Sequence, residues 1–344
     1  MAKTSIATGN ALTRKLWLAK NEQLFRDAAK ESYFLPRFGS EGKNSIVYEK
    51  KELTKERGDK MTFGIRMRLS GSGVGAGQTL EGNEESLTLH NYSVIMDRRR
   101  HAVRVERGLT KQRIQADLED EARAALKDWM AEYIDDQIFA ALRSTPTTVW
   151  YNNNGTPEKG TAAAVKADIS AAQDKLTPKL IRAVKTWATT GGNRSQTPLR
   201  PIKINGKNHF VLVCHPDAVY DLKNDSTYEQ YIREAEVRGK ENPLFNGAIA
   251  VIDNVVIHEH ESAYIATDGG GASEPYAECF FMGAQALCWA WGMREEMVQE
   301  EFDYKEEVGF GLGLNYAVGK TQFNSLDYGS VGVFVGRSQI SDAS

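Results

Sequence analysis

Hydrophobic and polar positions follow two different periods along the chain, so both strands and helices are predicted. In residues 61–69 every second residue is apolar, which is the period of a strand with one buried face. Residues 46–53 form a second strand-like run, and the stretch 87–105 is extended and heavily charged. Residues 12–29 instead show the spacing of an amphipathic helix, which ends before a break that contains Pro36.

The strongest helical pattern covers residues 109–142, with Thr110 as the expected N-cap. The apolar positions at helical spacing are Ile114, Leu118, Ala122, Ala125, Trp129, Tyr133 and Ile138. At a rise of about 1.5 Å per residue such a helix is about 50 Å long, far beyond the usual three turns. We therefore expect it to lie across a whole domain.

Shorter elements alternate in the second half of the chain. The predicted helices there are 169–187, interrupted at Pro178, then 216–222 and 228–236. The predicted strands are 210–213, 249–252 and 255–258, and later 302–308, 311–318 and 331–335, with a buried apolar run at 278–293. A chain that leaves the long helix, builds an α+β block and returns with strands is expected to form two discontinuous lobes.

Composition narrows the class of protein. The 344 residues include 43 Lys and Arg and 46 Asp and Glu, a formal net charge of −3, with 41% apolar and 26% charged residues. At about 150 residues per domain, two domains are expected. This composition excludes long disorder and a collagen-like chain. Near-neutrality also argues against a histone-like coat on DNA, because neutralising phosphates requires a basic surplus.

The cysteines and the apolar runs predict a chain that stays in a reducing cytoplasm, or in something assembled there. Cys214, Cys279 and Cys288 are an odd number without a Cys-x-x-Cys pair, so no disulfide framework is expected. Residues 1–10 are polar and do not resemble a secretory signal. The most apolar run, 279–293, is shorter than the roughly 20 residues of a membrane helix, so no membrane contact is expected.

Phosphate-binding motifs fail on spacing and context. Gly71, Gly73, Gly75 and Gly77 are not followed by a helix, so they are interpreted as a linker. The run Gly319-Lys320-Thr321 ends like a phosphate-binding loop, but Leu314 stands where that motif needs its first glycine. No Gly-x-Ser-x-Gly nucleophile elbow occurs either. We therefore assign no catalytic, cofactor-binding or metal-binding residues and expect no cofactor.

His258 and His260 are the one metal-like pair. In a strand they would share a face and could chelate a metal, but no motif places a third ligand. The alternative function left open is a cytoplasmic metal-dependent enzyme with dispersed catalytic residues near these two histidines. His215, which precedes Pro216, is expected to begin a helix rather than to act as a base.

Two charge clusters remain, one basic and one acidic. The basic cluster is Arg98, Arg99, Arg100, Arg104, Arg107, Lys111 and Arg113; the acidic cluster is Glu295, Glu296, Glu300, Glu301, Asp303, Glu306 and Glu307. Both can be solvated faces, and a nucleic-acid role is weakened because no aromatic residues interleave with the arginines. The third hypothesis is mutual contact between copies of the chain. The expected contact residues are Arg98, Arg99, Arg100, Arg104, Glu300, Glu301, Glu306 and Glu307.

The order of these elements resembles that of the major capsid proteins of tailed bacteriophages, with the Hong Kong 97-type capsid fold, and in particular the podophage-type major capsid family. The segments that carry the resemblance are the arm at 12–38, the extended loop at 46–106 with Leu80-Glu81-Gly82-Asn83-Glu84-Glu85, the helix 109–142, and the return through Phe280-Phe281-Met282-Gly283 to Trp289-Ala290-Trp291-Gly292. The resemblance spans nearly the whole chain.

This resemblance implies an α+β fold with an N-terminal arm, an extended β-hairpin loop, a spine helix, a peripheral domain and an axial domain. The implied boundaries are 1–39 for the arm, 40–108 for the loop, 109–168 and 277–344 for the peripheral domain with its spine helix 109–142, and 169–276 for the axial domain. The loop lysines Lys50, Lys51, Lys55 and Lys60 have no identified asparagine partner, so no covalent cross-link is expected.

The resemblance also implies a structural protein of the virion and not an enzyme. Such a chain self-assembles in the cytoplasm of the bacterial host into pentamers and hexamers, which form an icosahedral shell around a double-stranded DNA genome. The implied partners are other copies of the chain, scaffolding, portal and decoration proteins, and the packaged DNA, which is bound without sequence specificity.

Overall fold

The computed structural model describes most of the chain. It covers residues 32–51, 58–66, 69, 71–87, 89–107, 118–191, 198–204, 206–230, 249–270, 273–323 and 325–338. The predicted helix 12–29, the N-cap Thr110 and residues 231–236 of the last predicted helix lie outside these ranges.

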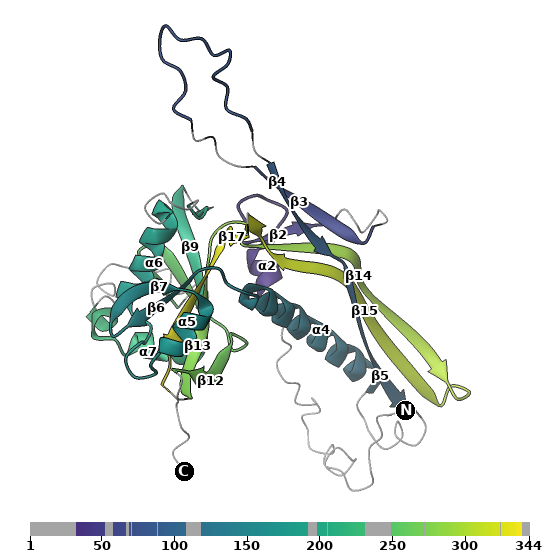
Figure 1. The fold of residues 1–344 in the computed structure, drawn as a ribbon. Coiled ribbons are helices and arrows are strands. Elements are labelled where there is room, and N and C mark those ends of the chain that lie inside the picture. Colours follow the sequence, from purple (N-terminus) through teal and green to yellow (C-terminus); the bar gives the residue numbers. More distant parts are fainter. Residues whose placement is uncertain are drawn as a thin grey trace.

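A long helix and a five-stranded sheet form one part of the molecule (Figure 1). The helix is α4 (Leu118–Arg143), and the strand order is β1 (Gly39–Ser40), β2 (Val47–Lys50), β14 (Leu287–Phe302), β15 (Glu307–Lys320) and β5 (Asp97–Glu106). β14 and β15 make a long antiparallel hairpin, and β5 pairs with β15 without a break in register from Tyr316↔Asp97 to Glu307↔Glu106. Within the described residues β5 is therefore an edge strand of this sheet.

Strand β15 explains why helix α4 covers only one face of the sheet. From Val308 to Leu314 its residues alternate between apolar side chains and glycine. Phe310, Leu312 and Leu314 are buried in the core that also contains the inward side chains of α4. Because successive strand residues point to opposite faces, the intervening glycines lie on the face away from the helix. The sheet thus has one helix-covered face and one open face, and these two names are kept below.

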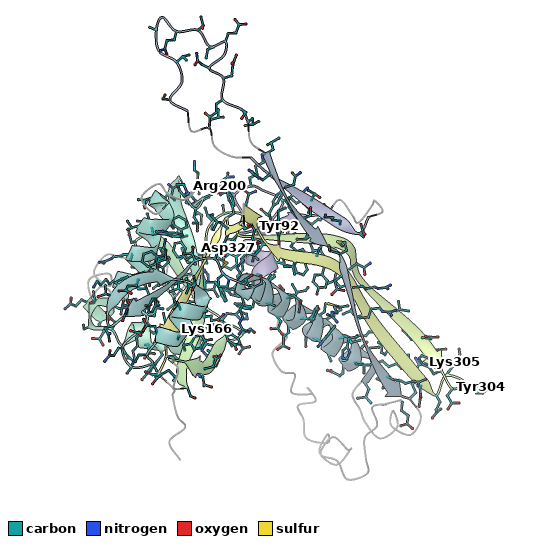
Figure 2. All side chains as sticks on the ribbon, in the orientation of Figure 1. Tyr92, Lys166, Arg200, Tyr304, Lys305 and Asp327 are labelled. Atoms are coloured by element: carbon teal, nitrogen blue, oxygen red, sulfur yellow. The ribbon has the colours of Figure 1, made fainter. Side chains whose placement is uncertain are left out.

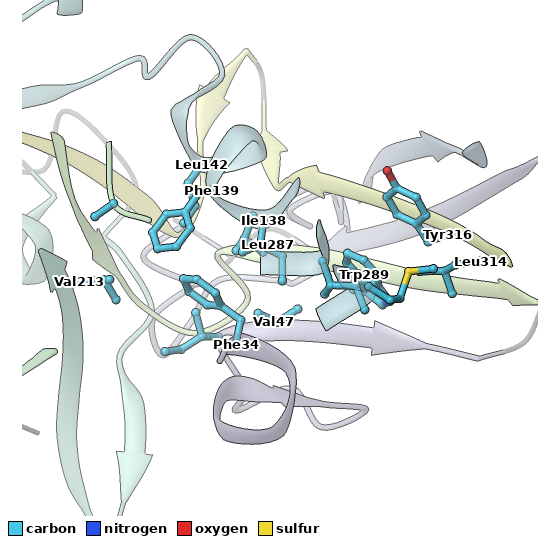
Figure 3. Close-up of a cluster of buried hydrophobic side chains, with 14 of the residues drawn as sticks. Phe34, Val47, Ile138, Phe139, Leu142, Val213, Leu287, Trp289, Leu314 and Tyr316 are labelled. Carbon is cyan, nitrogen blue, oxygen red and sulfur yellow. The ribbon is translucent and has the colours of Figure 1, made fainter. Parts of the chain in front are cut away.

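The apolar core continues from α4 into the segments around it (Figure 3). Phe34, Ile138 and Leu287 are among its fully buried side chains, as are Trp289 and Leu314. The stacked rings of Trp289 and Tyr316 have centroids 5.1 Å apart. Segments far apart in the sequence therefore share one core.

The buried stripe of α4 differs from the predicted one. Ala125 is exposed, and Trp129 and Tyr133 are half-buried at the flank of the helix. The buried apolar positions are instead Ala122, Leu126, Met130, Ile134, Ile138, Phe139 and Leu142, most of them spaced by three or four residues, and Asp135 is buried among them. Positions three and four apart share one face of a helix, and these side chains lie in the core between α4 and the sheet.

The second part of the molecule is a nine-stranded sheet with helices packed on it (Figure 1). Its strand path is β10 (Ala250–Ile252), β11 (Val255–Glu259), β9 (Lys207–Cys214), β13 (Glu274–Met282), β18 (Ser330–Gly336), β6 (Val149–Asn153) and β7 (Thr156–Gly160), with β12 (Ile265–Gly269) paired to β13 and β8 (Ile202–Ile204) paired to β9. The helices are α5 (Ala162–Asp168), α6 (Pro178–Thr190) and α7 (Pro216–Lys223). Leu180 and Val184 of α6 are buried with Leu222 of α7 in a second core.

Several local predictions for this region are corrected by the structure. Residues 169–187 are not one interrupted helix, because Pro178 is the first residue of α6 and the Thr177 side chain accepts a hydrogen bond from the Leu180 amide. Proline suits that position, since its missing N–H would be unpaired there anyway. His215 caps α7 as predicted. The predicted strand 302–308 is wrong, because a turn at Asp303–Glu306 joins β14 to β15.

The extended hairpin consists of β3 (Lys60–Arg66) and β4 (Leu89–Ile95), joined by a loop that projects from the body (Figure 1). The strand alternation predicted at 61–69 is confirmed at the root of the hairpin, where Met61 and Phe63 are buried with Val94. This small cluster rests on Cys288, Ala290 and Ala317 of β14 and β15. A Cβ at Gly319 would lie 2.7 Å from Val94, so glycine is needed for this close packing. The hairpin therefore covers one end of the open face.

A buried ion pair joins the end of α4 to the strands that follow it. The Lys320 ammonium donates to the Ser144 carbonyl at 2.6 Å and pairs with Asp327 at 3.1 Å, with both side chains almost fully buried. Asp327 also accepts the Thr147 amide at 2.9 Å. Burial lowers the pKa of Lys320, against the opposing effect of Asp327. The lysine thus satisfies a carbonyl at the helix end, where no intrahelical donor remains.

We predict that Lys320→Met destabilises the subunit by about 3–5 kcal/mol, because it leaves the Asp327 carboxylate buried without its cation. Denaturant unfolding of the dissociated subunit, followed by tryptophan fluorescence, measures the effect. The double variant Lys320→Met with Asp327→Asn should be more stable than Lys320→Met alone. An unfolding midpoint unchanged in the single variant would contradict the prediction.

Candidate assembly surfaces

The predicted contact residues lie on three neighbouring strands and on one hairpin tip. In the register of β5 and β15, Arg104 is opposite Gly309 and Arg100 is opposite Gly313, while Glu300 of β14 is opposite Gly309 from the other side. The basic and acidic clusters are therefore side by side in one sheet of one chain. Figure 2 shows the tip of the hairpin, marked by Tyr304 and Lys305, at the far end of this sheet.

On the helix-covered face, Arg107 links β5 to α4 and β14. Its guanidinium donates to Glu119 at 2.7 Å and to Glu301 at 2.9 Å. The hydrogen bond from Arg107 lowers the pKa of the Glu301 carboxyl. Arg99 lies on the same face, where a hydrogen bond with Tyr133 of α4 raises its pKa. These contacts fasten the edge strand to the helix within the chain.

On the open face, Arg104 and Glu307 form an ion pair at 2.8 Å. The Arg104 guanidinium also stacks on the Phe302 ring, 3.9 Å from its centroid. Among the predicted contact residues, the structure thus brings Arg104 to Glu307 and joins Glu301 to Arg107. The remaining ones, Arg98, Arg99, Arg100, Glu300 and Glu306, are exposed.

The extended loop carries an apolar surface whose residues are not among the predicted contact residues. Among the described residues of the hairpin and its loop, five large apolar side chains are more than half exposed: Leu69, Leu80, Leu87, Leu89 and Ile95. In the part of the chain that the structure describes, the loop joins no buried apolar cluster beyond the one at its root. The sequence held one signal for this, since no apolar period continues between residues 70 and 86 to bury a face. Exposed apolar side chains gathered on a projecting element mark an interaction site.

The arm is anchored at its root by a side chain in the middle of α4. The Asp135 carboxylate is buried and accepts the amides of Tyr33 at 2.6 Å and Phe34 at 3.2 Å, and the Ser32 hydroxyl at 3.0 Å. These groups begin the short helix α2 (Phe34–Phe38), so the break predicted at Pro36 is instead a helical turn. Proline is tolerated there because it lies in the first turn.

His258 and His260 pack against this same arm root. The His260 ring lies 4.7 Å from the Tyr33 ring, and the His258 ring lies 5.3 Å from the Phe38 ring. Within the described ranges no group of three or more His, Cys, Asp or Glu side chains is arranged to hold a metal ion. The histidines are thus part of an aromatic contact between β11 and α2. Of the helices that the structure describes, none combines the length and hydropathy needed to cross a membrane.

The fold and these surfaces define a structural subunit made to pack against other copies. Within the described residues its long sheet has a helix on one face only, and its loop projects away from both cores. The family model for the phage capsid protein matches residues 5–333, so the chain belongs to that family. The Hong Kong 97-type α+β fold is confirmed, and the chain is a shell-forming major capsid protein of a tailed phage and not an enzyme. The alternative enzyme centred on His258 and His260 finds no support.

Individual relatives agree with this assignment. The chain is 27% identical over 348 residues to the major capsid protein of Pseudomonas phage KPP25, covering 89% of this chain and 92% of that protein. It superposes on the capsid of Ralstonia phage GP4 with a TM-score of 0.83 and 25% identity, covering 99% of this chain and 100% of that one. The capsid protein of Cyanophage Pam1 has the same fold, with a TM-score of 0.71, 24% identity and coverage of 98% and 100%.

Removal of the arm anchor is predicted to free the arm root without unfolding the subunit. Asp135→Ala deletes a charged acceptor shared by three donors, and each such bond contributes about 1.5–3 kcal/mol. Amide exchange at Phe34 should become at least about tenfold faster, and proteolysis near Tyr33 should accelerate. Asp136→Ala, an exposed neighbour on the same helix, is the matched control. Equal exchange in the two variants would show that Asp135 does not hold the arm.

The pairing of Glu301 with Arg107 predicts a pH-dependent contribution to stability. Because the pKa of Glu301 is lowered in the folded chain, its contribution is present above the ordinary carboxyl pKa. The contribution is lost as pH falls through the lowered value. We expect Glu301→Gln to reduce the Tm at neutral pH and to match the wild type at the acid end of a pH series. A Tm difference that stays constant with pH would contradict this.

Proposed function

We propose that the chain assembles into pentamers and hexamers that close an icosahedral shell around the double-stranded DNA of a tailed phage. The carrying observation is the projecting loop at residues 71–87, whose leucines are exposed and lie far from both cores of their own chain. Burial of such side chains against a neighbouring copy lowers the free energy, because it removes apolar surface from water. An arm and a loop that cross between copies suit closed symmetric rings, because each copy both gives and receives the same contact.

We propose the division into an arm at 1–39, a loop at 40–108, a peripheral domain at 109–168 and 277–344, and an axial domain at 169–276. Two separate cores support two lobes, one around α4 and one around α6 and α7. The nine-stranded sheet spans this division, because β9 pairs with β13 across it. That shared sheet would keep the two lobes in a fixed relation.

The partners follow from the same proposal. Scaffolding, portal and decoration proteins would meet the shell during its assembly in the cytoplasm of the bacterial host. The packaged DNA would be enclosed without sequence-specific contact. The net charge of −3 supports this, because a coat that grips phosphates requires a basic surplus.

We also propose that the two charge clusters take part in contacts between copies. Arg104, Glu301 and Glu307 already form ion pairs within the chain, so their charges are largely compensated and they would contribute mainly the shape of the contact surface. Arg98, Arg100, Glu300 and Glu306 are exposed and would present charge to a neighbour, whereas Arg99 is held on the helix-covered face by Tyr133 and Asp97. Charges of this kind select register and partner more than they add affinity.

Electron microscopy and size-exclusion chromatography of the purified protein test the proposed assembly. We expect rings or closed shells from the wild type. The loop variant Leu87→Ser with Leu89→Ser should keep its fold but remain unassembled, because it removes apolar surface that only a neighbour can bury. Ser86→Ala is the matched control in the same loop. A wild-type chain that stays a stable monomer or dimer would contradict the proposal.

A further inference from the structure

The open face of the long sheet contains a bare region beyond the part that the hairpin covers. Residues Met61, Phe63 and Val94 pack over β14 and β15 at Cys288, Ala290 and Ala317. Toward the turn that joins β14 to β15, the same face is formed by alternate residues of β5, β15 and β14. No element among the described residues covers it there.

Glycines of β15 form the floor of this region. A Cβ at Gly309 would meet the Phe302 ring at 2.8 Å, and one at Gly313 would meet the Arg100 side chain at 3.2 Å, so both glycines are covered. Gly311 between them is open, because a Cβ there would have the Val298 carbonyl oxygen as its nearest neighbour, at 3.9 Å. The result is a notch one residue long.

The walls of this notch are apolar. In register, Gly311 lies between Val298 of β14 and Ala102 of β5. Val298 is 53% exposed, and Ala102 is also exposed. The Gly311 notch, defined by these three residues, is a small apolar depression on an otherwise charged face.

A row of arginines borders the notch on the edge strand. Arg98, Arg100 and Arg104 alternate along the open face of β5. Arg104 is engaged by Glu307 and Phe302. Arg98 and Arg100 are therefore the cations of this rim that face outward, next to the notch. An occupant that fits needs one apolar side chain flanked by negative charge.

The extended loop of the same sequence has this chemistry. No Lys or Arg occurs between Leu69 and Asp97, whereas Glu81, Glu84 and Glu85 fall within that stretch. The Asn83 amide donates to the Leu80 carbonyl at 3.0 Å, and Gly82 has a φ of 88°, so a tight turn displays this segment. Leu80 is 69% exposed at the start of the turn, directly before Glu81.

The loop and the notch of one chain cannot meet, since the loop points away from the long sheet (Figure 1). We infer that Leu80 of one copy inserts into the Gly311 notch of a second copy, with Glu81 and Glu84 facing Arg98 and Arg100 of that second copy. This inference rests on the proposed self-assembly and deepens it by naming the residues that set the register between neighbours. Apolar insertion supplies contact area, and the charges orient the loop.

Reciprocal charge reversal tests the pairing. The variants are Glu81→Arg with Glu84→Arg, Arg98→Glu with Arg100→Glu, and the combination of all four. Assembly is followed by light scattering at low salt and checked by electron microscopy, with circular dichroism to confirm the fold. We expect each pair to slow shell formation at least about tenfold and the combination to restore it to within about threefold of wild type. Lys127→Glu, on an exposed position of α4, should have no effect.

The notch is tested separately by filling it. Gly311→Val has room for its side chain and suits a strand, so the subunit should fold, but the variant should slow assembly as Leu80→Ser does. Single reversals that assemble normally, or a combination no better than either pair, would overturn the inference while leaving the proposed assembly intact. A wild-type chain that never forms shells would overturn both.

Discussion

The one-sided burial of the sheet formed by β14, β15 and β5 is the constraint on which the rest of the structure depends. Because Phe310, Leu312 and Leu314 all point to helix α4, the helix can run along the whole sheet with a continuous apolar contact. The same alternation places glycines on the other face, which no second helix covers in the described residues. A sheet with a continuous core on one face and glycines along part of the other leaves exposed surface for neighbouring copies.

Buried charges hold the joints between the parts of the molecule. Lys320 and Asp327 connect the end of α4 to the strands after it, and Asp135 holds the arm root to the middle of the helix. A third joint is Glu278 of β13, which is 1% exposed and pairs with Arg143 of α4 at 3.2 Å and with Lys166 of α5 at 3.0 Å. Each buried charge has specific partners, so displacing a joint would leave an uncompensated charge in the interior. Such joints define the relative placement of helix, arm and sheets more sharply than apolar packing alone.

The charge clusters show why assembly contacts are hard to assign from sequence. The arginines of β5 and the glutamates near the β14–β15 turn are about two hundred positions apart, yet they lie on neighbouring strands. Some residues of each cluster therefore form ion pairs within the chain, as Arg104 and Glu307 do. Only the tertiary structure separates these charges from those that face outward. The exposed leucines on the loop were likewise not assigned as contact residues, because the one sign of their exposure in the sequence is the lack of an apolar period around them.

The sequence by itself determined the class of fold, the long helix, the extended hairpin and most of the strands. These depend on local periods, on turn residues and on the order of elements, all of which can be read along the chain. Part of the buried stripe predicted for α4 was wrong by one residue. Leu126, Met130 and Ile134 are buried, whereas the prediction named their preceding neighbours Ala125, Trp129 and Tyr133. Helical spacing admits more than one apolar stripe, and packing against the opposing sheet selects among them. Which charges pair within the chain was decided only by the tertiary structure, because strand register and the packing of α4 on the sheet bring distant positions together.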